Sequence, residues 1–259
     1  MVPYCFVTCN VRLQTPADGE NQFENRVDFL CDTLLARRPD VIGMQELLPG
    51  MRRQMMARMP GYAFLGGGRD SARLGESPAL AVRQDRLMPE RLETQILSPT
   101  PHLPGTLYAS VQSSCPRAFW SAELMPLDGG RPFRVMNVHT DHIISEARQL
   151  QVAQMMGFLT LQNQLRPMPT VITGDFNALP DTLEMAIMQA MEHPRLQDAT
   201  AGMAGTFHDY GRLEQPEKID YIWLTEEWTV DRVQALHKQR GGLYLSDHDP
   251  IVANVTLHE

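Results

Sequence analysis

The sequence of 259 residues lacks the features of a membrane-spanning or secreted protein. It has no run of the roughly 18 apolar residues that a helix needs to cross a bilayer. Its first residues, MVPYCFVTCNVRL, show neither a basic segment ahead of an apolar core nor a small-residue cleavage pattern, so no secretory signal is visible. We therefore expect a cytoplasmic protein without membrane insertion, and no protein partner is implied.

Cysteine is scarce, with four in the whole chain. This number is too low for a disulfide framework in a chain of this length. None of the four pairs with a second cysteine or a histidine at the spacing of zinc ligands. The sequence therefore predicts reduced cysteines in the core, at Cys5, Cys9, Cys31 and Cys115.

Lysine is rarer still, because only Lys218 and Lys238 are lysines among 23 basic residues. The remaining arginines suit bidentate contact with phosphate or carboxylate groups. The net charge of −8 argues against tight binding of a long polyanion through bulk electrostatics, since such binding needs a basic face. Composition thus permits phosphate recognition and disfavours a broad nucleic-acid surface.

The sequence patterns predict more strands than helices. Apolar residues recur at helical spacing over 23–35, 48–59 and 147–165. Leu150, Ala153, Met156 and Leu161 mark the predicted buried face of the last helix. Strands are predicted at residues 3–11, 40–46, 78–83, 93–97, 118–124, 133–138, 170–174, 218–224 and 247–257. Because most strands lie too close together for a helix to intervene, we expect one α+β domain over residues 1–259, with mainly antiparallel sheets flanked by helices.

A glycine-rich segment, LGGGRDSARLGE, covers residues 65–76. Three adjacent glycines suggest a phosphate-binding loop, but the spacing fits neither a Walker-type loop nor a dinucleotide fingerprint. An ordinary flexible loop is the favoured interpretation.

Polar or charged residues stand at or near one end of six predicted strands. They are Asn10, Glu46, His139, Asp175 with Asn177, Asp220, and Asp247 with His248. Any one of them is most simply a turn residue, a cap or a buried hydrogen-bonded group. Sheets packed face to face, however, bring strand ends to a common rim. The six endings together therefore predict a shared site, and in an extended chain Asp175 and Asn177 would project on the same side.

The residue types of this predicted site suggest metal-assisted phosphate chemistry. Carboxylate and amide oxygens suit Mg²⁺ or Mn²⁺ better than zinc. His248 beside Asp247, with Asp220 available to orient its ring, forms a proton-handling group. The sequence has no G-x-S-x-G elbow, no cysteine protease signature and no H-E-x-x-H helix. Attack by water with the help of a metal ion is the simplest mechanism that remains.

Seven short motifs occur in a fixed order over nearly the whole chain. They are TCN (8–10), MQE (44–46), PRAFW (116–120), NVHTDH (137–142), TGDFNALP (173–180), KIDYI (218–222) and SDHDP (246–250). In this order they resemble the endonuclease/exonuclease/phosphatase superfamily, in a compact branch without appended domains. The resemblance implies a DNase-like α/β sandwich of four layers, in which two packed, mixed and mainly antiparallel sheets are flanked by helices.

The same resemblance implies which residues hold a metal ion and the attacking water. Glu46 would be the principal ligand of Mg²⁺ or Mn²⁺, with Asn10 and Asp247 beside it. Asp175 would orient or deprotonate the water, and Asn177 would hold the water or a phosphate oxygen. Whether one or two metal ions take part stays open.

The resemblance also implies which residues of the remaining motifs contact the phosphate. His248 would contact the scissile phosphate and handle charge or a proton, while Asp220 would fix its ring. His139 would contact the phosphate from the opposite side, and Arg117 would clamp a non-bridging oxygen.

The resulting hypothesis is a metal-dependent phosphoesterase for a phosphodiester or phosphomonoester, with a phosphorylated small molecule or a nucleic-acid end as its partner. A magnesium-dependent nuclease is the alternative, and a binding protein with a vestigial site is a third. Asp141, His142 and Arg148 are either supports of this site or purely structural. His208 is expected on a surface loop.

Overall fold

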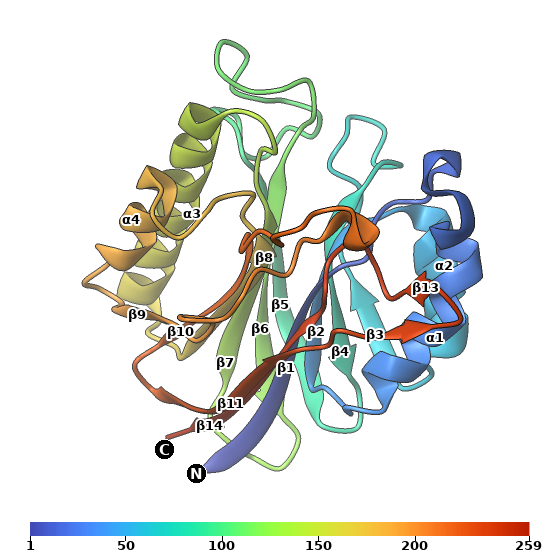
Figure 1. Ribbon diagram of the computed structural model, residues 1–259. Coiled ribbons are helices and arrows are strands. Elements are labelled where there is room, and N and C mark those ends of the chain that lie inside the picture. The colour runs from blue at the N-terminus through green and yellow to red at the C-terminus, as the bar shows by residue number, and fades with distance from the viewer. Residues whose placement is uncertain (259) are drawn as a thin grey trace.

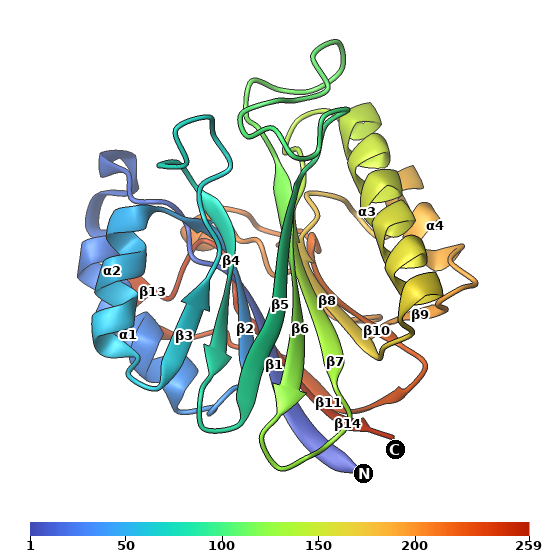
Figure 2. The same ribbon diagram turned by 180° about the vertical axis from the view of Figure 1, so that it is seen from behind.

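Two six-stranded sheets pack face to face in the computed structural model, which describes residues 1–258 (Figure 1). Each sheet carries a pair of helices on its outer face, which gives four layers. The two chain ends lie together at one end of the sandwich, and many of the connecting loops gather at the other (Figures 1 and 2). None of the helices in residues 1–258 is long and apolar enough to cross a membrane.

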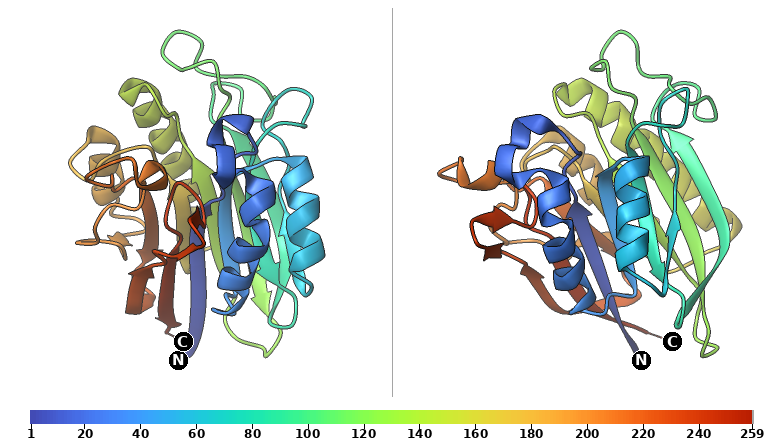
Figure 3. Two further views of the ribbon diagram at one scale, coloured as in Figure 1. Left: turned by 45° about the vertical axis from the view of Figure 1, so that its right-hand side comes forward. Right: turned by 90° about the vertical axis from the view of Figure 1, so that its right-hand side faces the viewer.

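The first sheet has the strand order β11-β14-β1-β2-β4-β3. Its strands are β1 (Val2–Asn10), β2 (Val41–Leu47), β3 (Tyr62–Leu65), β4 (Ser77–Arg83), β11 (Trp228–Ala235) and β14 (Ile251–Leu257). β1 runs parallel to β2, and all other pairs are antiparallel. Helices α1 (Phe23–Leu35) and α2 (Pro49–Arg58) cover its outer face (Figure 3).

The second sheet has the order β5-β6-β7-β8-β10-β9, again with one parallel pair, β7 and β8. Its strands are β5 (Leu87–Ile96), β6 (Ala118–Pro126), β7 (Phe133–His139), β8 (Thr170–Asp175), β9 (Leu196–Asp198) and β10 (Asp220–Thr225). Helices α3 (Ser145–Leu165) and α4 (Leu183–Gln189) cover its outer face (Figure 2). The strands β12 (Gln239–Arg240) and β13 (Leu243–Tyr244) form a separate two-stranded hairpin.

Strand alternation distributes apolar side chains into three separate cores. On β8, Val171 faces the core between the sheets, whereas the next residue, Ile172, faces the core beneath α3 and α4. On β1, Phe6 faces the core between the sheets and Val7 faces the core beneath α1 and α2. Central strands are therefore apolar on both faces, as a four-layer arrangement requires.

Polar contacts also join the two sheets. The side chain of Asn137 on β7 donates hydrogen bonds to the carbonyl oxygens of Met44 (2.8 Å) and Ala79 (2.9 Å) in the first sheet. It accepts one from Gln45 Nε2 at 2.7 Å. A Cβ atom on Gly43 would lie 2.0 Å from Thr173 Oγ1, so only glycine permits this close approach of β2 to β8. These contacts fix one sheet against the other directly beneath the strand ends.

The predicted fold is confirmed: the sheets are mixed, mainly antiparallel and flanked by helices. The sequence patterns missed the short strands β3 and β9 and the edge strand β11, and the division into one domain stays a prediction.

The predicted buried face of α3 is wrong for most of its residues. Leu150 and Leu161 are exposed, as is Ala153. The helix instead buries Val152, Met155, Met156 and Leu159, which follow the spacing i, i+3, i+4 and i+7. Because α3 carries apolar residues on both sides, only its packing against the sheet decides which side is buried.

Candidate active site

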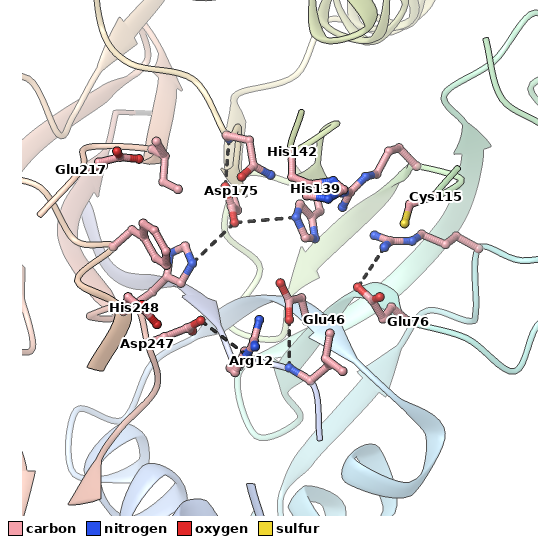
Figure 4. Close-up of a pocket in the computed structure, with 17 residues that line it drawn as sticks. Arg12, Glu46, Glu76, Cys115, His139, His142, Asp175, Glu217, Asp247 and His248 are labelled. Atoms are coloured by element: carbon pink, nitrogen blue, oxygen red, sulfur yellow. Dashed lines mark hydrogen bonds and ion pairs between the residues drawn. The ribbon is translucent and has the colours of Figure 1, made fainter. Parts of the chain in front are cut away.

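A pocket of about 540 Å³ opens between the loops at the ends of β1, β2, β7 and β8 (Figure 4). It lies where the sequence placed its polar strand endings. The lining includes seven of the predicted site residues, namely Glu46, Arg117, His139, Asp175, Asn177, Asp247 and His248. The other two, Asn10 and Asp220, are buried and hydrogen-bonded to lining residues.

Glu46 is aimed into the pocket by an irregular strand end. Its φ of 62° is unusual for a residue with a side chain, and the pairing of β2 with β4 shifts register between Met44 and Leu47. Such irregularities re-aim side chains beside functional sites. One carboxylate oxygen accepts from the Asn10 side chain at 3.2 Å and the other from the Leu13 backbone N–H at 2.9 Å.

Asp175 ends β8 and lies at the centre of the pocket. Its Oδ2 accepts a hydrogen bond from Asn10 Nδ2 at 3.0 Å, and its Oδ1 accepts from the Asn177 backbone N–H at 2.9 Å. The same carboxylate lies 3.7 Å from His139 Nε2 and 3.9 Å from His248 Nε2. Burial, with a further contribution from Asp220, raises the pKa of Asp175 to about 7.

Asn177 lines the pocket for a different reason from the one predicted. The strand stops at Asp175, and Asn177 has a φ of 48°, so the chain is not extended here. Its Nδ2 donates to the carbonyl oxygen of Thr140 at 3.2 Å. The turn, and not strand alternation, brings Asn177 to the side of Asp175.

His248 forms a buried pair with Asp220. Its Nδ1 lies 2.8 Å from Asp220 Oδ2, and both residues are buried. Burial alone would favour the neutral ring, but Asp220, Asp247 and Asp175 outweigh it and raise the pKa of His248 to about 10. The imidazole is therefore held as a cation with Nε2 directed toward Asp175.

The charge state of His139 is opposite to that of His248. Burial and the nearby Arg117 and Arg69 hold its pKa well below the usual value, so the ring is neutral. Its Nδ1 is buried without a hydrogen-bond partner. Arg117 is also buried, and it donates from Nη2 to His142 Nδ1 at 2.8 Å.

Two groups of charged residues line the pocket, and the labelled Asp247 and His248 of the first lie on the opposite side of Figure 4 from the labelled His142 of the second. The carboxylate wall consists of Asp175, Asp247 and His248, with Asp220 hydrogen-bonded to the His248 ring. The arginine wall consists of Arg69, Arg117 and His142. Glu46 and His139 lie between the two walls.

Sequence reasoning missed several lining residues, and Arg12, Arg69, Glu76 and Cys115 are among them. Residues 66–76 form a loop, as expected, but this loop also delivers Arg69 and Glu76 to the pocket, which the sequence did not predict. Its glycines and its two arginines were the available signal. His142, left open between a support and a structural role, also lines the pocket.

Three other residues named from the sequence lie outside the lining. Asp141 accepts hydrogen bonds from the backbone N–H groups of Ile143 and Ile144, both at 2.8 Å, and so holds the chain before α3. Arg148 joins α3 to α4 through Glu184 at 2.6 Å. His208 is buried with 3% exposure, which contradicts its expected place on the surface.

The donor groups of the pocket fit a hard divalent cation. Donor atoms of Glu46, Glu76 and His139 lie within 4.8 Å of one another, as do those of Asp175, Asp220 and His248. The first group has two carboxylates, which suits Mg²⁺ or Mn²⁺. In the second group the His248 ring is charged and hydrogen-bonded to Asp220, so it does not offer a metal ligand. Of the ligands expected from the sequence, Glu46 belongs to the first group, while Asn10 directs its amide N–H groups at Glu46 and Asp175.

Comparisons with known proteins identify the family of the chain. A family model described as the endonuclease/exonuclease/phosphatase family matches residues 7–248. A solved structure of an endonuclease/exonuclease/phosphatase from Bacteroides vulgatus is 28% identical, with 100% of both chains covered and a TM-score of 0.92. No curated protein matches the chain as a relative.

More distant solved structures share the fold. A mannosyl-6-phosphatase from Bacteroides thetaiotaomicron is 22% identical, with 98% of this chain and 100% of that chain covered and a TM-score of 0.87. The TDP2 protein of D. rerio, in complex with a single-stranded DNA product, is 19% identical, with 98% and 99% coverage and a TM-score of 0.74.

Proposed function

Since the chain belongs to the endonuclease/exonuclease/phosphatase family, we propose that it is a metal-dependent phosphoesterase that hydrolyses its substrate with an activated water molecule. One observation carries the proposal: Glu46, His139, Asp175 and His248, which come from four different segments of the chain, converge in one pocket. Structural ion pairs alone would not require these groups to open into a common cavity.

In this proposal Glu46 holds a Mg²⁺ or Mn²⁺ ion, with Asn10 and Asp247 nearby. When bound, the ion withdraws charge from the phosphate oxygens. The chemistry of the donor atoms supports this assignment, since oxygen ligands are what these cations prefer.

Asp175 acts as the base. A carboxyl group with a pKa of about 7 accepts a proton efficiently near neutral pH. The water oxygen forms a bond to phosphorus while its proton passes to Asp175. The bond between phosphorus and the ester oxygen breaks, and the leaving oxygen takes a proton from the His248 imidazolium. Asp220 keeps this ring charged and oriented, and Asn177 holds the water or a phosphate oxygen.

Charge that builds on the phosphate oxygens is balanced by fixed groups. Arg117 lines the pocket, and its Nε and Nη1 are buried without a hydrogen-bond partner among residues 1–258. His139 contacts the phosphate from the same side as Arg117. Because these groups are held in place before the substrate arrives, they stabilise the transition state without reorganisation.

A small phosphorylated molecule fits the pocket better than a polynucleotide, although a nucleic-acid end stays the alternative substrate of a nuclease. Asp209 and Glu217 also line the pocket and add negative charge to it. A long polyanion needs a continuous basic groove, and these acids interrupt one.

The test is hydrolysis of aryl phosphates, nucleotides and sugar phosphates by the purified protein with Mg²⁺ or Mn²⁺. We expect EDTA to abolish activity and added metal to restore it. Glu46→Gln should lower activity about 10²-fold or more. Unchanged activity of this variant in a sensitive assay would contradict the proposal and favour a vestigial site.

A further inference from the structure

Two buried arginines in the pocket keep hydrogen-bond donors without partners. Arg69 is 5% exposed and Arg117 is 3% exposed. Arg69 donates from Nη2 to Glu76 Oε2 at 2.8 Å, but its Nη1 has no partner among residues 1–258. Within the same range, Nε and Nη1 of Arg117 are also unpaired. Buried donors that lack partners are costly, and because both arginines line the pocket, an anion bound there would offer them an acceptor.

Arg69 is held in place by the backbone of its own loop. Its N–H donates to the Glu76 carbonyl oxygen at 3.1 Å, and its carbonyl oxygen accepts from the Gly105 N–H at 2.9 Å. A Cβ atom on Gly68 would lie 2.5 Å from the carbonyl carbon of Arg73, so the turn needs glycine there. The guanidinium is therefore positioned before any ligand binds.

The two guanidinium groups also repel each other. Burial lowers the pKa of Arg117 to about 10, and Arg69 contributes in the same direction. Arg117 has no carboxylate hydrogen-bonded to it, because its Nη2 donates to a neutral His142 nitrogen. An arginine can only donate, so Nδ1 of His142 is an acceptor and the proton of this ring lies on Nε2. The arginine wall thus carries more positive charge than its own residues neutralise.

The arginine wall lies next to the residues that we assign to the metal ion. Glu76, the partner of Arg69, has a donor atom within 4.8 Å of those of Glu46 and His139. Arg69 is therefore one side chain away from Glu46.

We propose that Arg69 and Arg117 together bind the terminal oxygens of the scissile phosphate and make this protein specific for phosphomonoesters. This inference rests on the proposed function. A phosphomonoester carries close to two negative charges at pH 7 and has three terminal oxygens, which match two guanidinium groups and a metal ion. A phosphodiester carries one charge, and its second ester group replaces one of the oxygens that the arginines would bind.

The experiment compares matched ligands in wild type and Arg69→Gln. Rates are measured with 4-nitrophenyl phosphate and bis(4-nitrophenyl) phosphate in the presence of Mg²⁺ or Mn²⁺. Binding of inorganic phosphate and of dimethyl phosphate to the metal-loaded protein is measured by calorimetry. We expect Arg69→Gln to lower kcat/KM for the monoester, and the affinity for inorganic phosphate, about 10- to 100-fold. The diester and dimethyl phosphate should change less than about threefold.

Two further variants control for charge and folding. Arg73→Gln removes the same charge from an exposed position in the same loop and should leave all four values unchanged. Arg69→Lys keeps a charge in the pocket, and we expect it to retain part of the preference for inorganic phosphate. An equal loss for both ligands in Arg69→Lys and Arg69→Gln would overturn the proposal, and so would a wild type that binds dimethyl phosphate as tightly as inorganic phosphate.

The binding measurements separate this inference from the proposed function. A wild type that hydrolyses neither ester, yet loses inorganic phosphate binding in Arg69→Gln, would reject the enzyme while supporting the anion site. Hydrolysis of both esters by the wild type, with unchanged selectivity in Arg69→Gln, would support the enzyme and reject the anion site.

Discussion

His139 and His248 are almost equally buried, at 3% and 5% exposure, yet they carry opposite charge. His139 lies beside the arginine wall, where burial and two arginines keep it neutral. His248 belongs to the carboxylate wall, where three aspartates raise its pKa to about 10. The comparison shows that neighbouring charges, and not burial alone, decide the protonation of a buried histidine. It also places a proton donor on one side of the pocket and anion-binding groups on the other.

The largest effect should follow from removal of the base on the carboxylate wall. Asp175→Asn keeps the shape of the side chain but cannot accept a proton from water, so kcat should fall about 10³-fold. Steady-state kinetics at pH 7 with a phosphate ester measure this. Asp181→Asn, an exposed change later in the same loop, should have wild-type kinetics. A rate for Asp175→Asn within about threefold of wild type would rule out its role as base.

The second effect concerns the contacts that hold the two sheets together beneath the pocket. Asn137→Ala removes three hydrogen bonds between the sheets, which Asn137 makes to Gln45 Nε2 and to the carbonyl oxygens of Met44 and Ala79. We expect the free energy of unfolding to fall by about 2–4 kcal/mol. Urea unfolding followed by tryptophan fluorescence tests this. Asn254→Ala, on a partly exposed position of β14, should cost less than about 1 kcal/mol.

A third substitution should give His248 the same neutral charge state as His139. In Asp220→Asn the main group that favours charge on His248 is lost, so its pKa should fall toward or below the ordinary value. Imidazole ¹⁵N shifts of the metal-free protein at pH 8 should show a charged His248 in wild type and a neutral one in the variant. His139 should stay neutral in both and serves as the internal control. Activity should drop about 10- to 100-fold, and a His248 that stays charged would refute this account of its pKa.

The smallest effect should come from His142 on the arginine wall. Burial and Arg117 lower the pKa of this ring below its usual 6.5, so it is neutral at pH 6.5 and gains a proton only at lower pH. Protonation removes the acceptor for Arg117. KM for a phosphate ester should therefore rise, by about three- to tenfold, as the pH falls far enough below 6.5 for the ring to gain its proton.

His142→Asn offers an acceptor that does not titrate, so its KM should vary less over this range. His102→Asn, an exposed change, should keep the wild-type profile. Identical profiles for wild type and His142→Asn would show that another group causes the acid limb.

The strand endings of the site could be predicted because they are local features. Asn10, Glu46, His139 and Asp175 each end or nearly end an apolar strand, and the strands of packed sheets end at a common rim. Asn177 was placed in the pocket for the wrong local reason, since a turn with positive φ brings it there. Periodicity identified α3 but not its buried side, because both sides carry apolar residues.

The residues between strands were less predictable. Arg69 belongs to a loop whose conformation depends on Gly105, far along the chain, and on the close approach of Gly68 to Arg73. No short-range pattern encodes such contacts. The sequence therefore identified a loop here but not its contribution to the arginine wall.

The sequence by itself determined most of the strands, the mainly antiparallel sheets and the identity of the oxygen and imidazole groups at the strand ends, since these follow from alternation and residue chemistry over a few positions. Only the tertiary structure decided which loop side chains enter the pocket, which face of α3 is buried and which histidine carries charge. Electrostatic fields and packing act between segments far apart along the chain, so they exist only once the two sheets have come together.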